Sequence, residues 1–318
     1  MFLLIALCNS ALPQPLIHAA VERSLPALNK AMAVHIEKKT CFGCHNQGYT
    51  MLATRWATAR GFPADEKLIA AVVEHAADFL VTNREKLEAG KSIGGSTDTV
   101  GWALSALHDG GHKPDAVTKA AVAFLLKTNA DLGHWRPTSS RPPTQSSHFT
   151  STYLAIRALQ NYAEDDQRET ADKRIASAKA WIEKTAAKDN EDRVFQLLGI
   201  KASGIDTAKA TKELLGKQRS DGGWSQLDTG ESDPYATGSA LVALHEAGGI
   251  ATDSNAYRKG IAFLLKCQKP DGTWHVATRS KPIQPYYESG FPYEKDQFIS
   301  CPASSWATAA LVLGLGNR

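Results

Sequence analysis

The sequence lacks the features that mark several large classes of protein. It has no apolar run long enough to cross a lipid bilayer, so we expect no transmembrane segment. Five cysteines in 318 residues are too few for a scaffold held together by disulfides. The 36 Lys and Arg residues nearly balance the 33 Asp and Glu residues, and the net charge of +3 indicates no nucleic-acid partner. An alternating strand pattern of useful length is also missing, which favours an all-α protein.

The most distinctive stretch that is present is Cys41-Phe42-Gly43-Cys44-His45. It has the C-x-x-C-H pattern of covalent haem c attachment, in which two thiols add to the porphyrin vinyl groups and the histidine binds the iron. We therefore expect one haem c, anchored by Cys41 and Cys44, with His45 as the proximal iron ligand. The alternatives are a redox dithiol or part of a zinc site, although no second C-x-x-C or H-x-x-H is present to complete a zinc site.

Residues 1–19 resemble a secretion signal because they begin with an apolar run, but a basic segment before that run is missing. The signal could be truncated, or the run could be an ordinary apolar first helix. Haem c is attached outside the cytoplasm, so we expect a periplasmic or otherwise exported protein. Cys267 and Cys301 could then form a disulfide, or they could simply be buried.

Residues 20–318 read as one domain built from a helical repeat. The segments Gln218–Trp224 and Gln268–Trp274 share the pattern Q-x-x-D-G-x-W and lie 50 residues apart. A third copy ends at Trp135, with Thr128 in place of the glutamine. Each copy follows an apolar helical pattern, and Asp-Gly is a strong signal for a helix stop and a turn.

A second kind of helix, rich in Ala, Gly and Ser, follows each of these tryptophans, and its small residues indicate burial on most sides. Counting gives six such inner helices, each preceded by a more charged outer helix. The inner ranges are 46–60, 98–108, 149–162, 191–202, 234–247 and 303–315, and the outer ranges are 20–38, 65–88, 114–128, 166–187, 206–217 and 254–267. Six hairpins of this kind can close into a barrel and so bury the end helices of the repeat.

The two complete repeats resemble the QW motifs of the squalene–hopene cyclase and terpenoid cyclase superfamily, which also includes the β-subunits of protein prenyltransferases. The resemblance covers about residues 20–318 and implies an α6/α6 toroid. The segments 284–293 and 296–300 resemble more closely a bacterial group that carries C-x-x-C-H ahead of squalene-cyclase-like repeats. That closer group brings no established activity that could be transferred.

The catalytic signatures that the resemblance implies are missing. Squalene–hopene cyclases carry a D-x-D-D acid cluster, and the nearest match here, the segment 164–166, is expected to be a solvated turn. Protein prenyltransferases bind zinc through Asp, Cys and His, and Asp296, Cys301 and His275 lack the D-x-C spacing. The glutamines and tryptophans of the repeats are expected to tie successive hairpins together rather than to catalyse.

In such a barrel the inner helices are parallel, so their N-termini gather at one mouth. Asp98 and Asp233 begin inner helices there and are candidate catalytic residues, or simple helix caps. Two long loops, 135–148 and 274–300, are expected to enter the same mouth.

Charged and aromatic residues of these loops could contact a ligand. Arg141 and Arg279 could pair with haem propionates or another anion, or they could be solvated. His148 is a tentative sixth iron ligand. The aromatic residues of the second loop could wall a pocket or pack on one another; they are Tyr286, Tyr287, Phe291 and Tyr293.

The sequence therefore predicts an exported c-type haem toroid that carries out electron transfer or haem-based redox chemistry beside a central pocket. Its expected partner is a redox protein or a small hydrophobic ligand. One alternative is an isoprenoid or triterpenoid cyclase-like enzyme without the usual acid motif. The other is a non-catalytic module that binds a lipid or a peptide.

Overall fold

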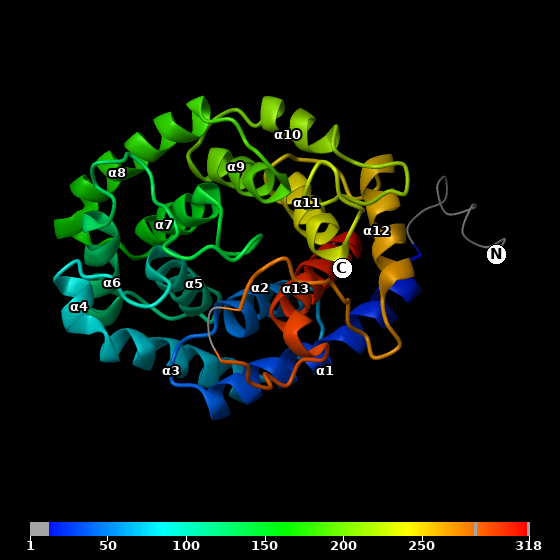
Figure 1. Ribbon diagram of the computed structural model, residues 1–318, viewed down its shortest axis with the longest axis horizontal. Coiled ribbons are helices and arrows are strands. Elements are labelled where there is room, and N and C mark those ends of the chain that lie inside the picture. The colour runs from blue at the N-terminus through cyan, green and yellow to red at the C-terminus, as the bar shows by residue number, and fades with distance from the viewer. Residues whose placement is uncertain (1–12, 283–284, 317–318) are drawn as a thin grey trace.

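The computed structural model describes residues 13–282 and 285–316 and is a ring of helices in two layers (Figure 1). The described residues form no strand, which confirms the all-α prediction. Six inner helices surround the centre, and the outer helices form a second ring around them. The prediction of an α6/α6 toroid is therefore confirmed.

The two rings alternate along the chain. The outer helices are α1 (Gln14–Lys38), α3 (Glu66–Thr82) with its short continuation α4 (Arg84–Glu88), α6 (Ala116–Lys127), α8 (Asp165–Lys184), α10 (Ala208–Leu215) and α12 (Asn255–Cys267). The inner helices are α2 (Tyr49–Ala59), α5 (Ser96–Asp109), α7 (His148–Tyr162), α9 (Asn190–Ala202), α11 (Pro234–Glu246) and α13 (Gln297–Gly314). A π-helical turn, Cys44–Gly48, leads into α2, and a 3-10 turn, Glu294–Asp296, leads into α13.

Small residues let the inner helices approach closely. In α11 every residue from Pro234 to Leu244 is buried. A Cβ atom added at Gly238 would lie only 2.7 Å from the backbone nitrogen of Ala307 in α13. The Ala- and Gly-rich composition of these helices therefore follows from their position between the outer ring and the centre.

The glutamine and tryptophan of each complete repeat join neighbouring hairpins. Gln218 Nε2 donates to the carbonyl oxygens of Gly222 at 2.9 Å and of Ala256, in the next outer helix, at 2.8 Å. Gln268 makes the same pair of bonds, at 2.9 Å to Gly272 and at 2.8 Å to Ala20 of α1. The second glutamine therefore closes the ring, because it links the last outer helix to the first.

The incomplete third repeat is completed by a residue from another helix. Arg174 of α8 donates to the carbonyl oxygens of Thr128 at 2.8 Å and of Asn129 at 3.1 Å. Its guanidinium carbon also lies 4.2 Å from the ring centre of Trp135. Arg174 thus takes over the role that a glutamine at position 128 would have, from 46 residues further along the chain.

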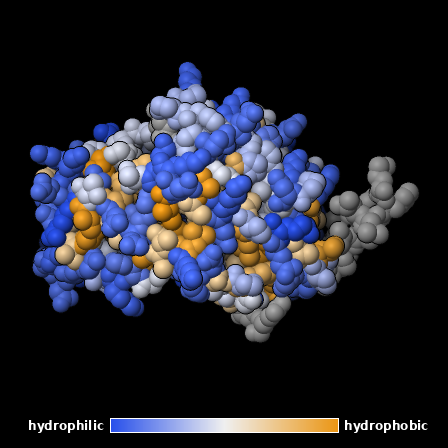
Figure 2. Space-filling model, turned by 90° about the horizontal axis from the view of Figure 1, so that it is seen from below, coloured by the Kyte–Doolittle hydropathy of each residue, from blue (hydrophilic) through white to orange (hydrophobic). Residues whose placement is uncertain are grey.

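The surface seen in Figure 2 is mostly hydrophilic, with smaller groups of apolar residues between the charged ones. Among the helices of the described part, none is both long and apolar enough to span a membrane. Of the expected signal, residues 1–12 lie outside the described residues, and Gln14 onward belongs to α1. Cys267 and Cys301 are free thiols, so the disulfide considered for them is not formed.

Candidate functional site

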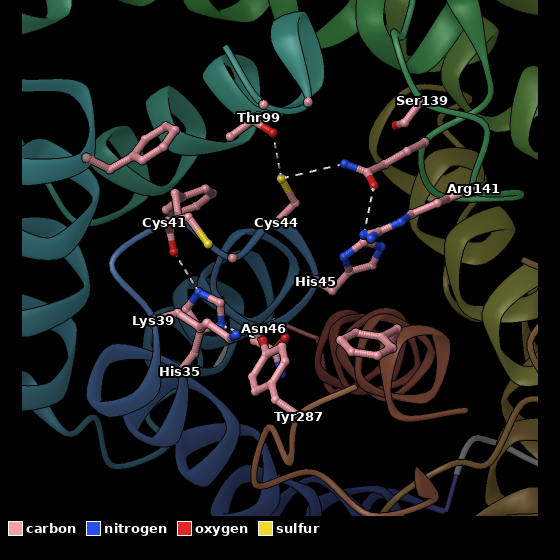
Figure 3. A pocket seen from close by; sticks show the side chains of 17 residues that line it. His35, Lys39, Cys41, Cys44, His45, Asn46, Thr99, Ser139, Arg141 and Tyr287 are labelled. Atoms are coloured by element: carbon pink, nitrogen blue, oxygen red, sulfur yellow. Dashed lines mark hydrogen bonds between the residues drawn. The ribbon is translucent and has the colours of Figure 1, made fainter. Parts of the chain in front are cut away.

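A cavity of about 410 Å³ opens at the mouth of the toroid, where the chain enters α2 and α5 (Figure 3). The π-helical turn, the start of α5 and the loop 135–147 build its walls, together with Tyr287 and Phe298. Its described lining comprises His35, Lys39, Cys41, Phe42, Gly43, Cys44, His45, Asn46, Phe79, Gly94, Gly95, Thr99, Ser139, Arg141, Gln145, Tyr287 and Phe298.

A second cavity of about 400 Å³ adjoins the first, and the two share His45, Arg141 and Phe298. The loop 274–300 supplies most of its remaining wall, including Tyr286. Ser280 Oγ donates to the carbonyl oxygen of Pro142 at 2.9 Å and so joins the two loops. The prediction that both loops enter one mouth is therefore confirmed.

The aromatic residues of the second loop divide into two groups. Tyr286 and Tyr287 line the cavities, as the pocket interpretation requires. Phe291 is buried against Leu28 and Ala31 of α1, and Tyr293 packs beside it. The alternative expectation, that the loop aromatics pack within the protein, is thus correct for Phe291 and Tyr293.

Cys44 forms part of the cavity floor. Its thiol donates a weak hydrogen bond to Thr99 Oγ1 at 3.6 Å, and Gln145 Nε2 donates to its sulfur at 3.9 Å. Burial raises the pKa of the Cys44 thiol to about 12, so this cysteine is not an activated nucleophile at neutral pH. Cys41 is exposed.

His45 is buried beside the guanidinium of Arg141 in Figure 3. Its Nε2 lies 2.8 Å from Thr144 Oγ1 in the loop 135–147. Burial, followed by the nearby positive charge of Arg141, lowers the pKa of His45 to about 3. The imidazole is therefore neutral at physiological pH and serves to hold the loop against the π-helical turn.

Asp98 lies just behind this floor, in the first turn of α5, and its side chain is fully buried. One carboxyl oxygen accepts a hydrogen bond from Ser151 of α7, and the other has no partner among the described residues. Burial raises the pKa of Asp98 to about 7. A protonated Asp98 therefore carries an acidic hydrogen that no group in the described part of the chain accepts.

The capping interpretation is wrong for Asp98 and correct for Asp233. Helix α5 is preceded by Gly95, and no side chain caps it. Asp233 instead accepts a hydrogen bond from the backbone nitrogen of Ala236 at 3.0 Å, which is the geometry of an N-cap. Burial raises the pKa of Asp233 to about 6, but its carboxyl group is occupied by the helix start.

Glu191 is a buried acid that the sequence reasoning missed. Its two carboxyl oxygens accept from Thr150 Oγ1 at 3.1 Å and from the Tyr235 hydroxyl at 2.9 Å. Burial raises its pKa well above the usual value. The only sequence signal was an acidic residue in the first turn of an inner helix. Because both oxygens are satisfied, Glu191 stabilises the contact between α7, α9 and α11.

Two residues predicted for the mouth lie outside the cavities. His148 is exposed, and its Nδ1 lies 3.0 Å from Nε2 of His134, which stacks on Trp181 of α8. Arg279 donates from Nε to Gln226 Oε1 at 2.8 Å and lines neither cavity. Of the two predicted arginines, only Arg141 faces the mouth.

The zinc elements of the prenyltransferases are not assembled either. His275 Nε2 lies 2.9 Å from Asp296 Oδ2, whereas Cys301 is buried with its sulfur 3.7 Å from Thr50 Oγ1. Within residues 13–282 and 285–316, no three His, Cys, Asp or Glu side chains are grouped as metal ligands.

Comparison with known proteins shows which proteins are similar to this chain in sequence and in fold. No protein-family model matches the sequence. The chain is 28% identical over 186 residues to a drimenyl diphosphate synthase of Streptomyces showdoensis, which covers 53% of this chain and 33% of that protein. It is 29% identical over 159 residues to the lanosterol synthase of Candida albicans, covering 41% of this chain and 21% of that protein. The chain thus spans about a third or less of the length of these relatives.

A structure of a type II terpene cyclase from Scytonema, in complex with geranylgeranyl dihydroxybenzoate, has a similar fold. The TM-score is 0.58 at 16% identity, and the similarity covers 94% of this chain and 99% of that one. The two rings and their mouth therefore define a closed α/α toroid. This toroid is the fold of the terpene cyclase superfamily, and about half of the chain is similar in sequence to a protein of that superfamily.

The prediction of a c-type haem electron-transfer protein is wrong. The chain is similar in sequence to a drimenyl diphosphate synthase and a lanosterol synthase, and in fold to a type II terpene cyclase, so its similarity is to terpene cyclases and not to c-type cytochromes. The side chains of the motif are also engaged separately: Cys44 with Thr99, and His45 with Thr144. The haem c cofactor is wrong as well, and with it fall the roles that depended on the haem: the anchors Cys41 and Cys44, the proximal ligand His45, the sixth ligand His148, and the propionate contacts of Arg141 and Arg279.

Proposed function

We propose that the protein is a terpene cyclase that starts ring formation by protonating a carbon–carbon double bond of an isoprenoid chain, with Asp98 as the acid. The observation that carries the proposal is the buried carboxyl group of Asp98, whose pKa is raised to about 7 and whose second oxygen is unpartnered. The fold similarity to a type II terpene cyclase and the sequence similarity to a drimenyl diphosphate synthase support it.

Protonation of an alkene requires an acid that is neutral at the pH of the reaction and that is shielded from water. Asp98 meets both requirements because burial favours its uncharged form. The Ser151 hydroxyl donates to the other oxygen and stabilises the carboxylate that remains after the proton leaves. One acid in the sequence Ser96-Thr97-Asp98-Thr99 would thus do the work for which squalene–hopene cyclases carry a D-x-D-D cluster.

The proton adds to one alkene carbon and leaves a cation on the other. Neighbouring double bonds attack this cation to form rings, and loss of a proton from the final cation restores neutrality. Aromatic side chains stabilise such cations through their ring faces. Phe79, Tyr287 and Phe298 supply such faces in the first cavity. Asp98 is not among the residues that line either cavity, whereas the adjacent Thr99 lines the first one, so the proposal requires the alkene to reach the acid beyond this lining.

The experiment is to incubate the purified protein with C15 and C20 polyprenyl diphosphates, geranylgeranyl dihydroxybenzoate and squalene, and to analyse the products by gas chromatography and mass spectrometry. We expect one substrate to give a cyclic product. The Asp98→Asn variant should lose at least about 100-fold in rate, because the amide has no acidic proton to give. Circular dichroism should show that this variant remains folded.

The matched control is Asp233→Asn, in which an asparagine keeps the helix cap. This variant should retain its rate within about threefold, since the Asp233 carboxyl group is bonded to the backbone of α11. Binding of all these substrates without any product would overturn the enzyme proposal. Equal loss in both variants would overturn the assignment of Asp98 as the acid.

A further inference from the structure

A further cavity, of about 170 Å³, is lined by all six inner helices of the ring in Figure 1 and therefore lies at its centre. We call it the axial cavity. One lining residue from each inner helix, in chain order, is Leu52, Ser105, Tyr153, Leu198, Val242 and Trp306. None of its described lining residues also lines the cavities of the mouth. The toroid thus contains a second place for a ligand, separate from the site described above.

The axial cavity opens at the end of the toroid opposite the mouth. The inner helices begin at the mouth, whereas Asp109 and Glu246, which line this cavity, are the last residues of α5 and α11. Arg55 lines it near the end of α2 and, like Glu246, is exposed. Trp102 and Trp306 are only 2% exposed and lie at its inner end. The cavity therefore has a charged rim and an apolar interior.

The interior has room for a small apolar group. Leu52, Trp56 and Tyr153 are half-buried and present apolar surface to the cavity. A dry cavity of about 150 Å³ with apolar walls can hold a molecule of benzene. A cavity of about 170 Å³ therefore accepts one aromatic ring or one branched aliphatic chain, but not a long isoprenoid.

The rim carries two positive and two negative side chains, of which only one pair is joined. Arg55 and Asp109 form an ion pair at 2.9 Å. Arg157 has no carboxylate within 4.0 Å among the described residues. Glu246, within the same limit and the same residues, meets only His245 Nε2, at 3.8 Å. One cation on α7 and one anion on α11 are thus left for a ligand.

Three simple classes of ligand leave part of this rim without an opposite charge. A neutral apolar molecule would leave the half-buried Arg157 uncompensated. An anion alone would lie beside Glu246 and near the C-terminal ends of the inner helices, which carry partial negative charge. A cation alone would lie beside Arg157. A molecule that carries both charges on one small head gives each of the two residues its opposite.

We propose that the axial cavity binds a free α-amino acid with an aromatic or branched apolar side chain. The carboxylate pairs with Arg157, whose planar guanidinium matches two carboxylate oxygens. The ammonium group pairs with Glu246, and the partial negative charge at the end of α11 adds to this attraction. The side chain enters the cavity between Leu52, Trp56 and Tyr153. This inference does not depend on the proposed function, because it concerns a different cavity.

Isothermal titration calorimetry of the full chain with L-phenylalanine and L-leucine tests the proposal. Each amino acid is compared with two analogues that lack one charge. The amino acid amide has no carboxylate, and the deaminated acid has no ammonium group. We expect at least one of the two amino acids to bind at least about 10-fold more tightly than both of its analogues, which is the range for a hydrogen bond to a charged group.

Two charge variants assign the head of the ligand. Arg157→Gln should abolish the preference for the amino acid over its amide, and Glu246→Gln should abolish the preference over the deaminated acid. Each variant should keep the other preference, because it leaves the other charge in place. The matched controls are Arg219→Gln and Glu183→Gln, which change exposed residues away from the cavity and should bind like the wild type.

A third variant tests the location of the site. Ser105→Leu extends a side chain into the cavity and should weaken the binding of every ligand by at least about 10-fold. Circular dichroism shows whether this variant is folded, and if it is not, the two charge variants decide alone.

Three results would overturn the proposal. The first is that neither amino acid binds below about 10 mM. The second is equal affinity for each amino acid and its two analogues, or a preference that survives in both charge variants. The third is unchanged binding in a folded Ser105→Leu variant, which would mean that the ligand lies outside the axial cavity.

Discussion

The junctions between hairpins and the floor of the mouth use polar residues in opposite ways. At the junctions, Gln218 and Gln268 each donate two hydrogen bonds to backbone oxygens, and Trp224 and Trp274 each donate one from Nε1 at 2.8 Å. At the floor, one oxygen of Asp98 is buried without a partner among the described residues. Satisfied polar groups stabilise a fold, whereas unsatisfied ones are expected where a ligand or a reaction completes them.

This contrast predicts opposite effects of substitution on stability. A change at a junction should destabilise the protein, because it breaks contacts that the folded state has completed. A change of Asp98 at the floor of the mouth can stabilise the protein, because burial of its carboxyl group is unfavourable for folding and is retained for the reaction.

The largest effect is expected from Asp98→Asn above neutral pH. The folded protein keeps the proton of Asp98 up to about pH 7, whereas the unfolded chain loses it near pH 3.8. Between these values the folded state binds more protons, so stability falls as pH rises and stays low above pH 7. Removing the charge should stabilise the protein at pH 8 by up to about 4 kcal/mol.

Urea unfolding of wild type and variant at pH 5 and pH 8 measures this difference. Glu191 and Asp233 also have raised pKa values and should leave some pH dependence in both proteins. The gap between the two proteins must widen from pH 5 to pH 8. A gap that is constant with pH would contradict the raised pKa of Asp98.

A slightly smaller effect of opposite sign is expected from Gly272→Ala at the junction that closes the ring. Gly272 has a φ of +85°, and a Cβ added there would lie 2.0 Å from the carbonyl oxygen of Arg23 in α1. We expect a loss of about 3 kcal/mol from the clash and the left-handed backbone together. Thermal unfolding followed by circular dichroism measures it.

Gly249→Ala is the matched control. Gly249 has a φ of +67°, and an added Cβ would meet no atom within 4 Å. This variant should lose only about 1 kcal/mol, from backbone strain alone. Equal losses in the two variants would mean that contact with α1 contributes nothing.

The smallest of the three effects is expected from Arg174→Ala, at about 2 kcal/mol. The substitution leaves the carbonyl oxygens of Thr128 and Asn129 without their donor and uncovers the Trp135 ring. The neighbouring Lys173→Ala, which removes an exposed pair with Glu169, should change stability by less than about 0.5 kcal/mol. If the two variants unfold at the same denaturant concentration, Arg174 does not replace the missing glutamine.

The fold could be predicted from the sequence because the pattern of one helical hairpin recurs several times along the chain. Each repeat carries its own helix stop and its own small-residue helix, so an unclear copy is corrected by its neighbours. The substitute for the missing glutamine could not be foreseen, because Arg174 reaches Thr128 only through packing of α8 on α6. Compensation of this kind depends on tertiary contacts that a motif does not contain.

For the site, the sequence named Asp98 and Arg141 as candidates, but the C-x-x-C-H motif led to the wrong ligand for the mouth. The chemistry of Asp98 depends on burial by residues distant in sequence, such as Ser151, 53 positions away. In the sequence Asp98 and Asp233 look alike, since each stands at an inner-helix start, and only the structure distinguishes the free acid from the cap.

The most direct test of the central claim is cyclisation in deuterium oxide. If Asp98 exchanges its proton with solvent and delivers it to the alkene, the cyclic product should carry one deuterium at the first carbon protonated, as detected by mass spectrometry and NMR. The Asp98→Asn variant should give at most a trace of this product. A cyclic product without solvent deuterium, or one formed at the wild-type rate by Asp98→Asn, would contradict the account.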